Sequence, residues 1–144
     1  MQNKMSLSFI SISQNEAFAR NVIASFMLSL NPTLSEISDV KTAVSEAVTN
    51  AIVHGYKSEM GIVELSAVID GQSIHIEIKD GGVGIENVDL AKEPFFTTGI
   101  EGERSGMGFT VMRTFMDSVD VISKVNEGTT VIMSKKISNG ADKE

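Results

Sequence analysis

The feature that most constrains the fold is the segment IVELSAVIDGQSIHIEIKD, which runs from Ile62 to Asp80. Apolar and polar residues alternate on both sides of Asp70 and Gly71, and this alternation is the period of a strand with one buried face. Asp-Gly is preferred in tight hairpin turns, because both central residues of such a turn need positive φ. The segment therefore predicts two antiparallel strands whose shared apolar face is covered by another layer.

The residues before this hairpin predict the covering helices. We expect a strand near residues 5–11 and then a helix near residues 14–30, opened by Ser13. Thr33 and Glu36 have the spacing of a capping box and mark the start of a second helix. We expect this helix to run to about His54 and to end at Gly55. The buried stripe of the first helix is expected to be Phe18, Val22, Phe26 and Leu30.

The second half of the chain interrupts this regular pattern once. Residues 81–108 contain seven of the twelve glycines and many charges, and a long irregular stretch inside a compact domain is usually functional or disordered. A short helix near residues 107–116 and a last hairpin, SVDVISK and TTVIMSKKI turning at NEG, follow it. We predict an α+β fold, a two-layer sandwich with helices on one face of a mixed, mostly antiparallel sheet. Residues 1–137 form its single domain, and residues 138–144 form a frayed tail.

Composition excludes several classes of function. The 144 residues suit one domain, and the net charge of -7 disfavours sequence-independent binding to nucleic acid or to an anionic membrane surface. The chain has no cysteine, which excludes disulfides, thiolate zinc sites and a cysteine nucleophile. It also lacks an export signal and an apolar run of the roughly 18 residues that a membrane span needs. We therefore expect a cytoplasmic protein.

An unusual polar stripe lies on the second predicted helix. In VSEAVTNAIVHGY, Glu46, Asn50 and His54 recur every four residues, so their side chains lie on one face. This face could be an ordinary solvated one, or it could carry chemistry. We leave His54 out of the candidate site, because a histidine beside Gly55 can cap the helix end. Five apolar residues lie roughly opposite, namely Val40, Val44, Val48, Ala51 and Ile52.

Three glycine-bearing segments add to this stripe: DGGVGI from Asp80, GMGF from Gly106 and GTTV from Gly128. Two glycines one residue apart let a backbone approach a ligand closely, and a helix that begins there directs free N–H groups at an anion. The chain contains neither a Walker A sequence nor a Gly-x-Gly-x-x-Gly fingerprint, so the P-loop and Rossmann interpretations fail.

The order of these segments resembles the ATPase and kinase superfamily of gyrase, Hsp90, histidine kinases and MutL, which implies the Bergerat ATP-binding fold. The resemblance extends from Met5 to about Ile137. SEAVTNAIVHGY and RSGMGFTVM are most similar to the anti-sigma serine kinases of spore-forming bacteria. The four boxes of the superfamily match, in order, Glu46, Asn50 and Ala51; Asp80, Gly82 and Gly84; Gly106 and Gly108; and Gly128 to Thr130.

The resemblance implies a role for each of these residues. Asn50 would hold Mg²⁺ through its side-chain oxygen, which suits a hard cation that takes few protein ligands, and Glu46 would be the general base. Asp80 would accept a hydrogen bond from the adenine amino group, with Thr130 nearby. Gly82 and Gly84 would let the chain pass close to the ring. The remaining ATP-binding candidates are Thr97, Thr98, Arg104, Ser105, Gly106, Met107 and Gly108.

Residues 85–105 resemble the nucleotide lid of the family, and lids commonly gate such reactions. We expect Phe95 and Phe96 to pack at the base of this lid. Two positions depart from the family pattern. Gly81 stands where an acid often follows the second-box aspartate, and Gly99 stands where a lysine often follows the two threonines. Arg104 would then be the only strong cation in the distal lid.

The resemblance also implies partners. It predicts a homodimer that binds and inhibits sporulation sigma factor F and that phosphorylates a serine of an anti-anti-sigma antagonist. Arg20 is our candidate partner-binding residue: it lies two residues after Phe18, about 200° around the helix and thus away from the expected buried stripe.

Three alternatives remain at this point. The first is a kinase of the same build that serves a general-stress sigma pathway. The second is a binding module that uses ATP only as a conformational ligand, although Glu46 argues against it, because pure binding needs no acid beside Mg²⁺. The third is an ATP-binding domain of the histidine-kinase type, which would need a separate histidine domain for which this chain has no room.

Overall fold

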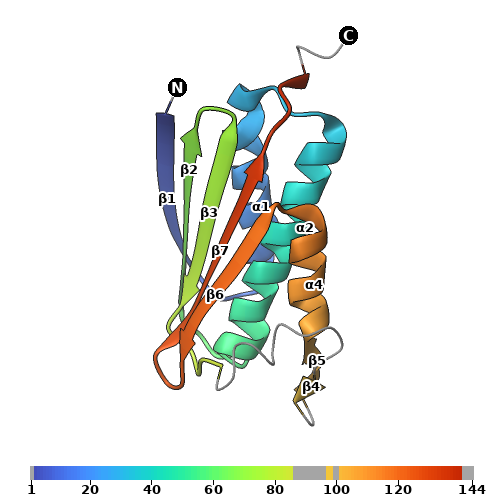
Figure 1. Cartoon of the computed structure of the whole chain (residues 1–144). Helices are drawn as coiled ribbons and strands as arrows, with labels where there is room; N and C mark the ends of the chain where they lie inside the picture. The colour runs from blue at the N-terminus through green and yellow to red at the C-terminus, as the bar shows by residue number, and fades with distance from the viewer. Residues whose placement is uncertain (1, 86–96, 99–100, 141–144) are drawn as a thin grey trace.

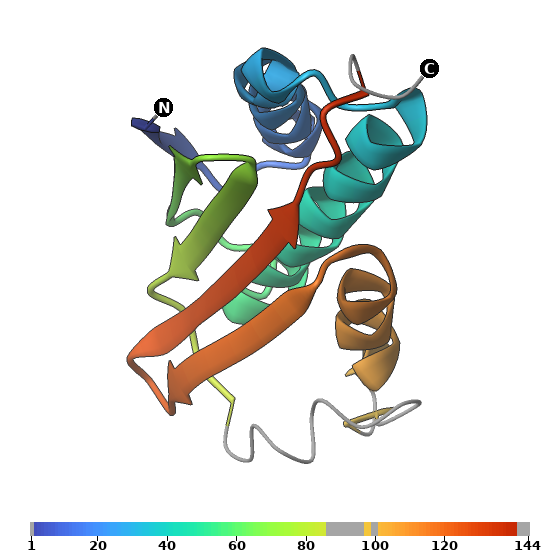
Figure 2. The ribbon, with the colours of Figure 1, turned by 45° about the horizontal axis from the view of Figure 1, so that its top comes forward.

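Figure 1 shows the computed structural model of the chain, which describes residues 2–85, 97–98 and 101–140. Of residues 97–98 and 101–107 only the backbone is described. A twisted sheet forms one layer, and the helices cover one of its faces (Figures 1 and 2). The expected two-layer α+β architecture is confirmed. Within the described ranges, no helix is long and apolar enough to cross a membrane.

The main sheet has five strands, and every neighbouring pair in it is antiparallel. The sheet that we expected to be mixed is therefore antiparallel throughout. Alternate residues of its central strands, such as Leu65 and Ile76, are fully buried beneath the helices. In spatial order the strands are β1 (Gln2–Ile10), β2 (Ile62–Asp70), β3 (Ser73–Asp80), β7 (Gly128–Lys136) and β6 (Ser118–Lys124).

The first hairpin turns one residue later than predicted. Asp70 pairs with Ser73, so the two turn residues are Gly71 and Gln72. Only Gly71 has positive φ, at 63°, which is typical of a two-residue turn with glycine at its first central position. The strands were nevertheless predicted correctly, because the alternation on either side does not depend on which residue carries the turn.

Helix α1 (Gln14–Phe26) continues as the short 3-10 helix η1 (Met27–Leu30). Of the predicted buried stripe only Leu30 is fully buried, since Phe18 is 50% exposed and Val22 and Phe26 are half-buried. Two stripes one residue apart both fit the helical period, and the structure buries the one that begins with a small side chain. Ser13 precedes the helix but makes no capping hydrogen bond through its side chain. The residues that are buried are Ala19, Ile23, Met27 and Leu30.

Helix α2 (Leu34–Thr49) begins with the predicted capping box. The Glu36 N–H donates to Thr33 Oγ1 (3.1 Å), and the Thr33 N–H donates to Glu36 Oε1 (2.9 Å). The helix then widens into one π-helical turn, η2 (Asn50–Gly55), which the sequence did not predict. Its expected end at Gly55 is confirmed, and the five apolar residues expected opposite the polar stripe are buried.

Two features differ from expectation near the irregular segment and at the C-terminus. A small sheet, β4 (Thr97–Thr98) and β5 (Glu101–Ser105), lies within the segment expected to be irregular, and helix α4 (Gly106–Phe115) follows it. The frayed tail does not begin at residue 138, because the Ser138 N–H and hydroxyl donate to the Glu36 carboxylate (2.9 and 3.0 Å). Residues 141–144 lie outside the described part of the chain.

Candidate functional site

Four segments that are far apart in the sequence meet at one end of the molecule. The end of α2 with η2, the end of β3, the start of β7 and the start of α4 all lie at the lower end of Figure 1. They carry the four predicted boxes. Antiparallel pairing explains part of this arrangement, because it places Asp80, the last residue of β3, opposite Thr129 near the start of β7.

Glu46, Asn50 and Gly108 are brought together by the packing of α4 against α2. A Cβ atom at Gly108 would lie 3.1 Å from Asn50 Nδ2 and 3.7 Å from Glu46 Oε2. Gly108 is in the first turn of α4, whose N–H groups lack partners within the helix. A carboxylate, an amide and the N-terminal end of a helix thus converge, an arrangement suited to a phosphate group and its cation.

The electrostatic surroundings of Glu46 differ from those of a surface glutamate. Burial raises the pKa of its carboxyl group above the usual value, and the negative charge of Glu16 on α1 raises it further. Both effects disfavour the ionised form. A carboxylate in such a place accepts a proton more readily than an exposed one, which is what a general base requires.

Asp80 is buried, with 5% of its surface exposed, and its carboxylate lies against η2. Asp80 Oδ1 accepts the N–H of Gly82 at 2.9 Å. A Cβ atom at Gly55 would lie only 2.7 Å from the same oxygen. Gly55 is therefore a site residue that sequence reasoning missed, since we interpreted it as a helix stop. The positive φ values that follow the helix belong to Lys57 and Ser58.

The glycines of the second and fourth boxes are required by contacts between backbone segments. A Cβ atom at Gly82 would lie 2.0 Å from the carbonyl oxygen of Gly55, and one at Gly84 would lie 2.0 Å from that of Lys124. Gly128 has a φ of +98°, and its Cβ would lie 2.0 Å from the carbonyl oxygen of Asp80. These close approaches hold the strand ends and η2 around Asp80.

Tyr56 is a second residue that sequence reasoning missed. Its hydroxyl donates to the Ile62 carbonyl at 2.6 Å and accepts the Gly81 N–H at 2.7 Å, so it links η2 to the start of β2 and the end of β3. No sequence pattern marks this contact, which depends on the folded arrangement. A Cβ atom at Gly81 would meet only the Tyr56 hydroxyl, at 3.4 Å, which is ordinary van der Waals contact.

The remaining candidates lie at the margins of this site. Thr130 is half-buried in β7, opposite Lys79, while its neighbour Thr129 is buried and contacts Ser123 (Oγ1 to Oγ, 2.8 Å). His54, which we left out, is buried in η2. The backbone of Thr97, Thr98, Arg104 and Ser105 forms the β4–β5 sheet, and Gly106 and Met107 begin α4. Phe95, Phe96 and Gly99 lie outside the described residues.

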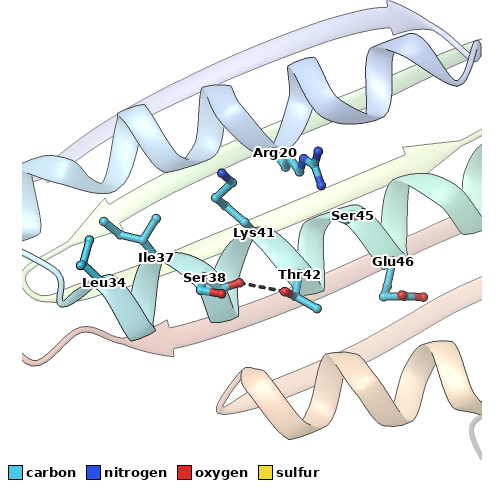
Figure 3. A pocket seen from close by; sticks show the side chains of 8 residues that line it. All are labelled: Arg20, Leu34, Ile37, Ser38, Lys41, Thr42, Ser45 and Glu46. Carbon is cyan, nitrogen blue, oxygen red and sulfur yellow. Dashed lines mark hydrogen bonds between the residues drawn. The ribbon is translucent and has the colours of Figure 1, made fainter.

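Arg20 is not part of this cluster, but it shares a groove with Glu46. Its Nε lies 3.4 Å from Glu16 Oε2, and its side chain is 40% exposed. The groove has a volume of about 500 Å³ and lies between α1 and α2 (Figure 3). Arg20 is thus outside the core, as predicted, although the reason differs, since Phe18 is itself exposed.

Comparison with known proteins identifies the family. The model of the histidine kinase-like ATPase domain matches residues 13–135. The anti-sigma F factor of Anoxybacillus flavithermus is 55% identical over 138 residues, which are 95% of this chain and 94% of that protein. The anti-sigma F factor of Clostridium kluyveri is 56% identical over 133 residues, 92% of this chain and 94% of its own. The chain belongs to the anti-sigma F factor family.

Solved structures agree with the fold of this family. The RsbU and RsbW domains of a Mycobacterium tuberculosis protein align with a TM-score of 0.68 at 16% identity, over 94% of this chain and 32% of that chain. The catalytic domain of the histidine kinase ThkA aligns with a TM-score of 0.57 at 14% identity, over 94% and 97% of the two chains. The histidine kinase-like ATPase fold implies that the chain binds ATP.

Proposed function

We propose that the chain binds and inhibits sporulation sigma factor F and, as an Mg²⁺-dependent serine kinase, phosphorylates its anti-anti-sigma antagonist. One observation supports this most strongly: in a chain 55% identical to an anti-sigma F factor, Glu46 and Asn50 lie against Gly108 at the start of α4. We further propose a cytoplasmic homodimer, with residues 1–137 as the kinase domain and residues 85–105 as its lid.

The residues around Asp80 fit an adenine nucleotide. The Asp80 carboxylate, whose Oδ1 accepts the Gly82 N–H, would accept a hydrogen bond from the adenine amino group. On the next strand, Thr129 lies opposite Asp80 on the same face of the sheet, whereas the predicted Thr130 lies opposite Lys79 on the other face. The N–H groups at the start of α4, from Gly106 to Gly108, would bind the phosphates. Thr97, Thr98, Arg104 and Ser105 would close over them from the β4–β5 sheet.

Asn50 and Glu46 would carry the chemistry. When both are bound, ATP supplies the phosphoryl group, and Mg²⁺ supplies much of the charge neutralisation that the transfer needs. The Asn50 side-chain oxygen would hold the cation, which needs few protein ligands when phosphate oxygens complete its shell. Glu46 would orient the serine hydroxyl of the partner and take its proton, while the serine oxygen bonds to the γ-phosphorus and the bond to ADP breaks.

The test is to incubate the purified chain with ATP labelled at the γ-phosphate, Mg²⁺ and the anti-anti-sigma protein, and to map the label. We expect a single phosphorylated serine on the partner and no transfer when Mg²⁺ is chelated. Nucleotide binding without any transfer would instead support a binding module gated by ATP. Capture of a general-stress sigma factor in place of sigma factor F would support the related switch kinase.

A further inference from the structure

A row of three polar side chains crosses three strands at the end of the sheet nearest η2. Antiparallel pairing places Asp80 of β3 opposite Thr129 of β7, and Thr129 in turn opposite Ser123 of β6. Residues directly opposite each other project to the same face of a sheet, with their Cβ atoms about 4.5–5.5 Å apart. Asp80 and Thr129 are buried, and Ser123 is half-buried. The function proposed above uses Asp80 and gives Ser123 no role.

The Ser123 hydroxyl contacts three groups. Its Oγ accepts the N–H of Ile85 at 2.8 Å and donates to the carbonyl oxygen of Gly128 at 2.9 Å. It also lies 2.8 Å from Thr129 Oγ1, a contact in which either hydroxyl could be the donor. A backbone N–H can only donate and a carbonyl oxygen can only accept. The contacts with Ile85 and Gly128 therefore limit what Ser123 can do toward Thr129.

The direction of the hydrogen bond between the two hydroxyls follows from counting protons. A serine hydroxyl has one proton and two lone pairs. The proton of Ser123 is given to Gly128, and one lone pair is taken by the Ile85 N–H. The remaining lone pair can only accept, so the proton between the two hydroxyls must come from Thr129. The Thr129 oxygen is then left with lone pairs alone, and it can accept a hydrogen bond from a ligand but cannot donate one.

This direction bears on which nucleobase the site prefers. An ionised carboxylate such as that of Asp80 also accepts hydrogen bonds and does not donate them. Asp80 and Thr129 lie side by side on one face, so together they present only acceptors to a base. An exocyclic amino group has two protons and suits such a pair. An oxo group in its place would bring another acceptor against them and leave all three without a proton.

We propose that Ser123 is a positioning residue of the nucleobase site. By holding the proton of Thr129, it makes the site select a base with an exocyclic amino group over a base with an oxo group at the same position. Ser123 acts through Thr129 and needs no contact with the nucleotide. This inference rests on the proposed contact between Asp80 and adenine, to which it adds a second acceptor and the residue that fixes the direction of its hydrogen bond.

The test compares the Kd for ATP with the Kd for inosine triphosphate, in which an oxo group replaces the adenine amino group. We expect the wild-type chain to bind ATP at least about tenfold more tightly. In Ser123→Ala the Thr129 proton is released and can be donated to the oxo group, so this preference should fall at least about threefold. Any general loosening caused by the missing hydroxyl weakens both nucleotides alike and leaves the ratio of their Kd values unchanged.

Ser118→Ala is the matched control. It makes the same substitution on the same strand, and the Ser118 hydroxyl also contacts a hydroxyl of β7, that of Ser134. This pair lies at the other end of β6 from Ser123, where Ser118 is exposed. The preference for ATP over inosine triphosphate should therefore be the same in Ser118→Ala and in the wild-type chain.

A double-mutant cycle shows whether Ser123 acts through Thr129. Thr129→Val removes the hydroxyl that Ser123 orients, so adding Ser123→Ala to Thr129→Val should leave the nucleotide preference within about 1.5-fold. An equal effect of Ser123→Ala in both backgrounds would overturn the proposal. An unchanged preference in Ser123→Ala, with ATP still bound, would overturn it too and leave the proposed function intact. A wild-type chain that binds both nucleotides equally would overturn the Asp80 contact and the role of Ser123 together.

Discussion

At the scale of single residues, the site depends on a few polar groups whose surroundings change their chemistry. Glu46 is half-buried and close to the charge of Glu16, so its pKa is raised, while Asp80 is buried against Gly55 and Gly82. The match to the first and second boxes of the superfamily indicated Glu46 and Asp80 in the sequence. Their surroundings could not be predicted, because Glu16 lies on α1, which carries no recognisable motif, and Gly55 was interpreted only as a helix stop.

Glu46→Gln should keep ATP binding and lose phosphotransfer, because the amide preserves the shape of the side chain but cannot accept the serine proton. Loss of a general base typically lowers the rate on the order of 10²–10⁴-fold. Transfer of labelled phosphate and calorimetric titration with ATP measure the two effects on one preparation. Equal turnover by the variant and the wild-type chain would remove Glu46 from the mechanism.

Asp80→Asn should weaken adenine nucleotides. The amide can keep its oxygen toward the Gly82 N–H, which leaves its NH₂ group facing the adenine amino group, so two donors oppose each other. An unsatisfied buried donor costs about 1–3 kcal/mol, which corresponds to a roughly 5- to 150-fold loss in ATP affinity. Unchanged affinity by calorimetry would mean that Asp80 serves only the turn to Gly82.

At the scale of helices and strands, the prediction was right where the repeat of apolar residues extends over a long segment. It was wrong where two repeats fit the same segment. The strands around Gly71 and the helix capping box of Thr33 and Glu36 depend on local patterns, and both are confirmed. The stripe of α1 was wrong at Phe18, because two adjacent stripes are equally periodic and only the packing against the sheet selects one. The π-helical turn η2 and the β4–β5 sheet are too short to have a detectable period.

Gly128→Ala should destabilise the junction between β3 and β7. Gly128 has a φ of +98°, and a Cβ atom there would lie 2.0 Å from the Asp80 carbonyl oxygen. A strained backbone conformation alone costs about 1–3 kcal/mol, and the close contact adds to it. Urea unfolding measures the loss of stability. Gly71→Ala is a useful comparison, since Gly71 also has positive φ but nothing lies within 4 Å of its Cβ position.

Arg20→Glu should weaken partner binding and leave ATP binding intact, because Arg20 lies on α1, away from the nucleotide cluster. The cost depends on the interface: about 2–5 kcal/mol for a buried pair and much less at the rim. The new carboxylate would also face Glu16, so the neutral variant Arg20→Gln separates loss of attraction from this added repulsion. Sigma factor and anti-anti-sigma binding that survive both changes would show Arg20 to be an ordinary surface arginine.

At the scale of the whole molecule, the fold class followed from the alternation of residues 62–80 and from the two amphipathic helices before them. The attachment of the C-terminus did not, because residues 138–140 have the composition of a loose tail. In the structure Glu36 links the start of α2 to Ser138, and the Gln72 side chain donates to the carbonyls of Leu30 and Ile137 (3.1 and 3.3 Å).

Glu36→Gln should therefore reduce stability most at neutral pH. Burial alone would raise the pKa of Glu36, but hydrogen bonds from Thr33 and Ser138 outweigh it, and the net pKa is lowered. A carboxyl group with a lowered folded-state pKa stabilises the fold above its unfolded-state pKa, and this contribution is lost as the pH falls through the folded-state value.

The expected difference in unfolding free energy is on the order of 1 kcal/mol at about pH 7, which is the size of a hydrogen-bond contribution, and it should be smaller at about pH 3, because protonation of the folded chain removes it. Urea unfolding of the two chains at both pH values measures it. A difference that is the same at both pH values would mean that the charge of Glu36 does not contribute.

The position of Tyr56 has a spectroscopic consequence. It is the only tyrosine of the chain, and there is no tryptophan, so intrinsic fluorescence excited at wavelengths that phenylalanine does not absorb comes from one phenol ring. The hydroxyl of that ring is hydrogen-bonded to Gly81, next to Asp80, and a Cβ atom at Gly61 would touch the ring. Any displacement of this corner changes the environment of the fluorophore. The unlabelled chain thus contains a built-in optical reporter one hydrogen bond away from the backbone on which the adenine ring would rest.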